Sequence, residues 1–311
     1  MHKGSAKHKN KIFTIVFPSV ITLTIFYLLI RNIGIGKIVK EFSNANLTYV
    51  FYAFMMSLVL VILSGQKLKL FIEMMGYEIS FLRCQEITIA TYAFNVIIPS
   101  KGGDLIKCWS LRDIISISRG AGMVILERFL DIILLCLMAF IGSLFIKNVK
   151  LMSLSFLLLL ILMICLLLLC ILRSFNIKNK FLERVKGIGF ALESFFNNYK
   201  YSLFIILIGT FIWVGSAFQI YILYIAVGQK VPFLFSMAVV PVAIFIGLIP
   251  VSIGGMGTRD AALIYLFSAY ASESGSLIVG LFFSLLRYWF LALLGIPFLG
   301  SLKSKEPQES A

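Results

Sequence analysis

The sequence has few charged residues, and this shortage excludes most classes of soluble protein. Charged residues make up 14% of the 311 residues, against about 25% in an ordinary soluble domain. Hydrophobic residues make up 60% of the chain, which is more apolar surface than a soluble domain of this size hides in its core. A soluble globular enzyme, a disordered chain and a coiled coil are therefore excluded, and the lipid bilayer is the expected solvent.

Ligands for metals and cofactors are also scarce. The chain has two histidines, both in the N-terminal tail, and five cysteines that form no CxxC pair. At least three of the cysteines lie in long apolar runs, which is typical of small buried hydrophobic residues. The sequence therefore predicts no metal site, no cofactor and no disulfide framework.

Positive charge is the feature that the sequence has in excess. It contains 28 lysines and arginines against 14 acidic residues, a net charge of +14. In a membrane protein such an excess mainly sets the orientation and meets anionic lipid head groups. No basic and aromatic module typical of RNA or DNA binding is visible, so we expect no nucleic-acid partner.

Long apolar runs predict an all-α, polytopic membrane bundle. A membrane helix needs about 20 apolar residues, and uninterrupted runs favour helices over a barrel. Six full spans are predicted, at 12–30, 47–64, 119–146, 151–172, 201–227 and 276–299. We expect a single membrane domain over 1–311, with cytoplasmic tails at 1–11 and 300–311.

Two further apolar pieces, 87–98 and 232–249, are too short or too broken for plain spans. Each runs into a proline and a glycine cluster, and a second half-helix follows. Proline removes a helix hydrogen bond and glycine allows a sharp turn, and irregular backbone at membrane depth needs protein or a wet cavity around it. Both pieces are predicted to be re-entrant broken helices, although glycine and proline that merely allow tight packing are the alternative.

The predicted elements occur in the same order in 12–146 and in 151–299: span, span, re-entrant hairpin, span. Three crossings in each half give the halves opposite orientations, and inverted repeats with broken helices are typical of secondary transporters. Basic residues are most frequent in the segments that are cytoplasmic when both termini are inside, which include 65–86 with Lys67 and also 173–200. We therefore expect a multi-pass protein of the cytoplasmic membrane.

The first break contains Gly102, Gly103 and Asp104, followed by Lys107. Glycines before a half-helix leave backbone N–H groups uncovered, and such a helix N-terminus binds anions. Lys107 adds positive charge one turn later, and Asp104 is placed to cap the half-helix. A phosphate cradle and a purely capping role for Asp104 both remain open.

The second break has a similar arrangement of glycines followed by residues suited to bind an anion. Thr258 is placed to cap the next half-helix, Arg259 can hold a phosphate with two hydrogen bonds, and Asp260 can position that arginine. The alternative is a structural Arg259–Asp260 pair that joins the hairpin to the bundle. The glycines of this break are Gly254, Gly255 and Gly257.

Four more charged residues are predicted near the middle of the membrane. Glu127 and Asp131 are four residues apart on one helix, where they repel each other unless a cation such as Arg128 lies between them. Arg287 is near the centre of the last span and needs an acid, with Asp131, Glu127 and Asp260 as candidates. Charges at this depth are usually functional or paired, so a role in handling substrate or protons and a structural ion network are both open.

These motifs resemble the lysylphosphatidylglycerol synthase transmembrane-region family, a group of flippase-like membrane proteins. The resemblance lies in Ile98–Lys107, Leu126–Asp131 and Pro250–Asp260, which are similar to the family patterns P-x-x-G-G-D-x-x-R, E-R-x-x-D and P-x-x-x-G-G-x-G-x-R-E. Lys107 stands where the pattern has arginine, and Asp260 where it has glutamate. Both replacements keep the charge.

The resemblance implies a protein that moves or handles lipids at the cytoplasmic membrane. The expected partner is an anionic phospholipid or a lipid-linked polyprenyl phosphate, held between the two breaks. In the lysyl-lipid synthases a soluble catalytic domain follows, and we expect none here and no catalysed reaction. An integral-membrane transferase, or a non-catalytic partner of a separately encoded lipid-modifying enzyme, are the alternatives.

Overall fold

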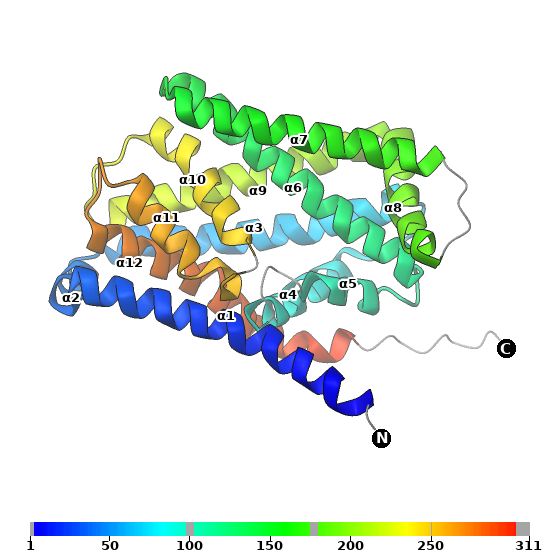
Figure 1. The fold of residues 1–311 in the computed structure, drawn as a ribbon, viewed down its shortest axis with the longest axis horizontal. Coiled ribbons are helices and arrows are strands. Elements are labelled where there is room, and N and C mark those ends of the chain that lie inside the picture. Colours follow the sequence, from blue (N-terminus) through cyan, green and yellow to red (C-terminus); the bar gives the residue numbers. More distant parts are fainter. Residues whose placement is uncertain (1–2, 98–102, 175–179, 250, 303–311) are drawn as a thin grey trace.

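The computed structural model describes residues 3–97, 103–174, 180–249 and 251–302, and in these residues it contains helices and no strand. The elements follow one another along the chain as a bundle of long helices interrupted by short ones (Figure 1). The predicted all-helical class is confirmed. The helix ends, however, differ from the predicted spans in ways that matter for the site.

The first two helices form a sharply bent pair. Helix α1 (Lys3–Ile33) and helix α2 (Ile35–Ser43) meet at an angle of 88°. Gly34 makes the bend with φ 89°, a backbone conformation that side-chain-bearing residues rarely adopt. Helix α1 already begins at Lys3, so most of the predicted cytoplasmic tail 1–11 is helical, and its place outside the membrane stays a prediction.

Helix α3 (Leu47–Met74) begins at the cap residue Asn46, whose side chain accepts a hydrogen bond from the backbone N–H of Thr48. It continues ten residues beyond the predicted span 47–64. Lys67 therefore lies on a helix inside the bundle and is 3% exposed. Its assignment to a cytoplasmic loop is wrong.

The first break separates helix α4 (Phe81–Ile97) from the short helix α5 (Leu105–Ser110). Helix α6 (Ile117–Phe145) follows and matches the predicted span 119–146 closely. Helix α7 (Val149–Ser174) comes next, and helix α8 (Lys180–Asn197) packs against α6 where only a loop was predicted.

The second half continues with helix α9 (Tyr199–Ala226) and helix α10 (Phe233–Leu248). The second break contains the 3-10 turn η2 (Ile253–Gly255) and leads into helix α11 (Thr258–Leu266). Helix α12 (Glu273–Ser284) then runs into a π-helical segment, η3 (Leu285–Trp289). Helix α13 (Phe290–Gly295) and the 3-10 segment η4 (Ile296–Leu302) complete this last apolar stretch.

Within the described residues, four helical stretches are long and apolar enough to cross a membrane, or five if the bent pair of α1 and α2 is counted as one span. The four are Leu47–Met74, Val149–Leu168, Tyr199–Ala226 and Glu273–Gly300. A multi-pass membrane protein is therefore confirmed. The count of six spans, the re-entrant hairpins and the inverted repeat stay predictions.

The helices lie roughly along one long axis (Figure 1). Helix α7 forms one edge of the molecule and α1 the opposite edge, while α3 and α9 pack together between them. The first residues of α1, helix α8 and segment η4 lie towards one end of this axis, and α2 lies at the other end. These described parts of the segments predicted to be cytoplasmic thus share one end.

Two apolar clusters hold the bundle together. One is built mainly by α9, α10, α11 and α12 around Tyr224 and Phe267, whose rings stack with centroids 4.5 Å apart. The other is built by the second half of α3 with α5, α6 and α8 around Phe71 and Met123. The charged residues come from these same helices, so packing of the two clusters determines where the charges meet.

Candidate functional site

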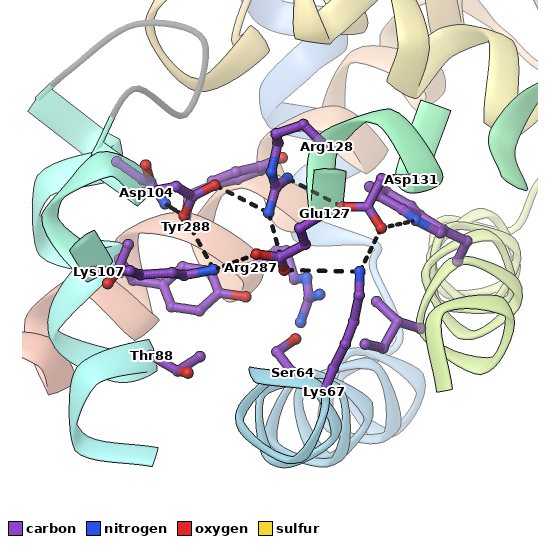
Figure 2. A pocket seen from close by; sticks show the side chains of 15 residues that line it. Ser64, Lys67, Thr88, Asp104, Lys107, Glu127, Arg128, Asp131, Arg287 and Tyr288 are labelled. Atoms are coloured by element: carbon purple, nitrogen blue, oxygen red, sulfur yellow. Dashed lines mark hydrogen bonds and ion pairs between the residues drawn. The ribbon is translucent and has the colours of Figure 1, made fainter. Parts of the chain in front are cut away.

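A polar cavity of about 60 Å³ lies among α3, α4, α5, α6, α9 and η3 (Figure 2). This volume is large enough for several water molecules or a small polar group. Seven charged side chains are among the fifteen residues that line it. Six of them are predicted site residues, namely Asp104, Lys107, Glu127, Arg128, Asp131 and Arg287, and the seventh is Lys67.

Glu127 of α6 is at the centre of the charged residues. One of its carboxylate oxygens, Oε2, lies 3.0 Å from the ammonium of Lys107. The other, Oε1, lies 3.4 Å from Arg128 and 3.7 Å from Lys67. Three cations from three helices thus surround one carboxylate that is 5% exposed.

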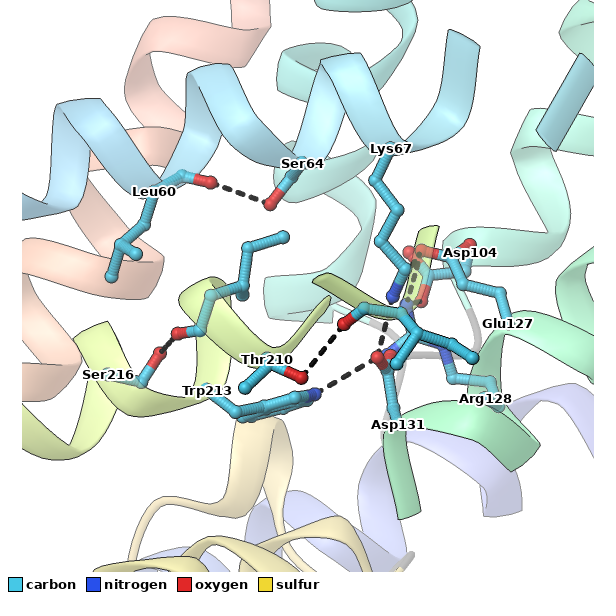
Figure 3. Close-up of polar contacts among 12 residues, drawn as sticks. Leu60, Ser64, Lys67, Asp104, Glu127, Arg128, Asp131, Thr210, Trp213 and Ser216 are labelled. Atoms are coloured by element: carbon cyan, nitrogen blue, oxygen red, sulfur yellow. Dashed lines mark hydrogen bonds and ion pairs between the residues drawn. The ribbon is translucent and has the colours of Figure 1, made fainter. Parts of the chain in front are cut away.

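Asp131, one helical turn further along α6, has three partners of its own (Figure 3). Its Oδ1 accepts hydrogen bonds from Lys67 at 2.6 Å and from the indole N–H of Trp213 at 3.0 Å. Its Oδ2 lies 3.3 Å from Arg128. Cations do lie between the two carboxylates of α6, as the spacing of Glu127 and Asp131 predicted.

Asp104 connects the first break to this network. It occupies the cap position of α5, but its side chain makes no capping hydrogen bond. The carboxylate instead lies 3.0 Å from Arg128, 3.7 Å from Lys107 and 3.0 Å from the amide of Asn95, which donates to it. The predicted capping hydrogen bond is wrong, because the cations of the cavity attract this carboxylate more strongly than two or three backbone N–H groups do.

Gly103 explains why the first break contains glycine. A Cβ atom at this position would lie 2.7 Å from the side chain of Asn95 and 2.8 Å from its backbone. Only glycine lets the chain pass this close to the end of α4, which brings Asp104 to the cavity. Gly102, the other predicted glycine of this break, lies outside the described residues.

Lys67 and Trp213 are the site residues that sequence reasoning missed. The polar stretch Ser64–Lys67 resembled the end of a span, so Lys67 was counted with the loop. The signal was present in the following residues, because Leu68–Met75 is apolar except for Lys69 and Glu73, and no glycine or proline interrupts it before Gly76. Trp213 gave no comparable signal, since its role depends on where α9 packs.

Arg287 lines the cavity from η3 and is 8% exposed. The described residues include none that forms an ion pair or hydrogen bond with it, and its buried Nη1 has no partner. The predicted ion pair with Asp131, Glu127 or Asp260 is therefore wrong. Those carboxylates are already occupied by Lys67, Lys107, Arg128 and Arg259.

The second break forms a separate ion pair. Arg259 and Asp260 are 1% and 0% exposed, and their closest charged atoms are 2.6 Å apart. Arg259 also donates to the hydroxyl of Ser284 at 2.6 Å and to the carbonyl of Gly280 at 3.2 Å. This pair joins α11 to α12, as the structural alternative stated, and neither residue lines the charged cavity.

Asp260 also caps helix α11. Its Oδ2 accepts a hydrogen bond from the backbone N–H of Gly257 at 3.0 Å. Thr258 is already the first helical residue, and its hydroxyl bonds instead to Ser252 and to the carbonyl of Gly255. The prediction that Thr258 caps the half-helix is therefore wrong.

The glycines of the second break allow backbone conformations and close contacts that other residues would not. Gly254, Gly255 and Gly257 all have positive φ, and a Cβ at Gly255 would lie 2.6 Å from the carbonyl of Gly247 on α10. None of these three glycines lines the charged cavity. Their predicted role in substrate binding stays a prediction.

An apolar cavity of about 620 Å³ lies next to both breaks. Val96 at the end of α4 and Ile253 and Met256 of the second break line it, together with residues of α1 and α12. Helix α4 also contacts η2 directly. The end of α4 therefore lies beside the second break, and both line the apolar cavity.

Residues 15–295 match the protein family described as the lysylphosphatidylglycerol synthase TM region. The chain belongs to this family. The matched residues include all the helices that line the charged cavity. The resemblance noted in three short motifs is therefore confirmed over nearly the whole chain. A comparison with curated proteins gave no match.

Proposed function

We propose that the protein is flippase-like: it binds the anionic head group of a membrane lipid, a phospholipid or a polyprenyl phosphate, in the charged cavity and moves it across the membrane. The observation that carries this proposal is a charged cavity inside an otherwise apolar bundle. Burying charges in a membrane protein is costly, and residues that only had to pack would be apolar. A function that needs these charges explains why they are there.

The geometry suggests how a head group is held. Lys67, Lys107 and Arg128 place their cationic groups around one small volume, and ammonium and guanidinium groups bind phosphate through charge-assisted hydrogen bonds. Arg128 has the most exposed side chain of the three, at 28%. It is therefore the cation that an entering head group meets first.

The apolar cavity beside the breaks supports a lipid as the ligand. A lipid needs a polar site for its head group and an apolar surface for its chains. Asn95 lines the charged cavity, and the next residue, Val96, lines the apolar one. A molecule that is charged at one end and apolar at the other fits across this boundary.

The predicted inverted repeat gives a route for transport. In Figure 1, α4 and α5 lie between one end of the bundle and its middle, and α10 and α11 lie between the other end and the middle. In secondary transporters, broken helices of this kind place the substrate near the bilayer midplane. We propose that both termini face the cytoplasm, which predicts that Asn148→Cys, between α6 and α7, reacts with a membrane-impermeant thiol reagent only from outside.

The test compares two lysine variants of the full chain, reconstituted in vesicles that contain fluorescent phosphatidylglycerol. Lys107→Met removes a cation that lines the cavity. Lys69→Met is the matched control, because Lys69 does not line the cavity and lies in a partly exposed pair with Glu73. Transbilayer movement is measured from the fluorescence that a membrane-impermeant quencher removes.

We expect the wild type and Lys69→Met to accelerate the transbilayer movement of phosphatidylglycerol. Lys107→Met should bind the lipid about ten- to a hundredfold more weakly, which is the effect of losing one charge-assisted contact. Native mass spectrometry of the same samples measures that binding. A wild type that neither moves the fluorescent lipid nor prefers phosphatidylglycerol to diacylglycerol contradicts the proposal.

A further inference from the structure

Arg287 is a buried cation that none of the described residues neutralises. Its side chain points into the charged cavity from η3 (Figure 2), and it is 8% exposed. Among the described residues it has no ion pair and no hydrogen bond. An unpaired charge inside a membrane bundle is strongly unfavourable unless a ligand or water compensates it.

The charges around the cavity can be counted. The described lining residues include four cations, Lys67, Lys107, Arg128 and Arg287, and three carboxylates, Asp104, Glu127 and Asp131. The three carboxylates pair with the first three cations. The described lining of the cavity therefore carries one uncompensated positive charge, and Arg287 supplies it.

We infer that the cavity is built for a ligand with a single negative charge, a phosphodiester, and that Arg287 supplies the positive charge that this ligand balances. The inference rests on the proposed function and narrows its substrate class. A phosphodiester brings the cavity to neutrality. A phosphomonoester, with close to two charges above its second pKa of about 6, leaves a buried negative charge.

A second unpaired group supports a ligand at the same place. The hydroxyl of Thr88 on α4 is 4% exposed, lines the cavity and has no hydrogen-bond partner among the described residues. Buried hydroxyls nearly always find a partner. A phosphodiester oxygen would accept hydrogen bonds from both Thr88 and Arg287.

The π-helical segment explains how Arg287 reaches this position. Within η3, Arg287 and Tyr288 line the charged cavity, whereas Leu285 and Trp289 line the apolar one. Segments of π-helix are frequent at functional sites because they shift side chains out of the regular helical register. This segment forms part of both walls, which suits a lipid that has its phosphodiester on one side and its chain on the other.

The experiment measures lipid binding to the purified full chain by native mass spectrometry, with phosphatidylglycerol, phosphatidic acid and diacylglycerol of identical acyl chains at pH 8. Three variants are compared with the wild type. Arg287→Gln removes the charge, and Arg287→Lys keeps it. Arg31→Gln removes one charge from an exposed position at the end of α1.

We expect the wild type to bind phosphatidylglycerol more tightly than phosphatidic acid, and both more tightly than diacylglycerol. Arg287→Gln should bind phosphatidylglycerol about ten- to a hundredfold more weakly. Arg287→Lys should bind more tightly than Arg287→Gln, and Arg31→Gln should match the wild type. In lipid-free detergent Arg287→Gln should unfold no earlier than the wild type, because it removes an uncompensated charge.

Each other result overturns the inference. If Arg287→Gln binds phosphatidylglycerol as tightly as the wild type, or unfolds earlier without lipid, Arg287 has a partner inside the protein. If phosphatidic acid binds as tightly as phosphatidylglycerol, the single-charge rule is wrong. In these cases the proposed function survives as long as the wild type prefers phosphatidylglycerol to diacylglycerol, and it fails separately if that preference is missing.

Discussion

The two breaks look alike in sequence, with a proline, a glycine cluster and then charged residues, yet the structure uses their charges differently. At the first break, Asp104 and Lys107 join a network that surrounds a cavity. At the second, Arg259 and Asp260 pair with each other and leave no cavity between them. Similar motifs have thus produced an open charged site and a closed structural pair.

The difference comes from what each break packs against. The first break faces α6, which brings Glu127, Arg128 and Asp131 and so makes a network of many members. The second break faces α12, which offers Arg259 the hydroxyl of Ser284 and the carbonyl of Gly280, both neutral groups. A buried charge that meets only neutral groups must bring its own counter-ion, and Asp260 is that counter-ion.

The largest effect is expected at the closed pair. Arg259→Met leaves Asp260 as an uncompensated buried carboxylate, which should lower the free energy of unfolding by about 3–5 kcal/mol. Unfolding in a titration with a denaturing detergent measures this. If Arg259→Met is as stable as the wild type but binds phosphatidylglycerol weakly, the second break is the binding site and our comparison of the breaks is reversed.

A smaller loss in the free energy of unfolding is expected in the charged network around the cavity, where each carboxylate has more than one partner. Lys67→Met removes the closest cation of Asp131, but Arg128 and Trp213 remain beside that carboxylate. We expect a loss of about 3 kcal/mol, and a partial rescue when Asp131→Asn is added. Lys69→Met on the same helix is the control and should cost less than about 1 kcal/mol. Purely additive effects of Lys67→Met and Asp131→Asn would show that the two residues are not coupled.

A still smaller loss in the free energy of unfolding is expected from Trp213→Phe, which removes a single hydrogen bond to Asp131. The expected cost is about 1.5 kcal/mol, at the lower end for a hydrogen bond to a charged group. The same detergent titration measures it. A cost equal to that of Lys67→Met would mean that Trp213 holds α9 in place mainly by packing.

The smallest effect is expected for the ion pair at the start of α4. Arg83 and Asp113 are 2.5 Å apart, but their side chains are 29% and 15% exposed. Water screens such a pair, so Arg83→Gln should change the free energy of unfolding by less than about 1 kcal/mol. A change as large as that of Lys67→Met would show that the burial of an ion pair does not determine how much it contributes to the free energy of unfolding.

Much of the helical architecture could be predicted from the sequence. The runs 119–146, 151–172 and 201–227 correspond closely to α6, α7 and α9, because a long uninterrupted apolar run has few alternatives in a membrane. The errors occurred where polar residues interrupt a helix, as at Lys67 in α3, and where a helix carries many polar residues, as in α8.

The site was predicted in part for the same reason. Glu127, Arg128 and Asp131 were recognisable because charges in an apolar helix stand out. Their partners were not, since Lys67 and Trp213 lie 60 and 82 residues away from Glu127 and Asp131 respectively. Arg287 was recognised as unusual from the sequence. Its lack of a counter-ion among the described residues is visible only in the three-dimensional arrangement of the cavity.

The sequence by itself determined that this is a helical membrane protein with charged residues inside apolar helices, and it predicted two broken helices. Composition and periodicity suffice for that, since each depends on local stretches of the chain. Only the tertiary structure decided which charges neutralise each other, that Arg259 is enclosed, and that Arg287 is left over. Electrostatic pairing depends on distances of a few ångströms between distant helices, and helix packing alone sets those distances.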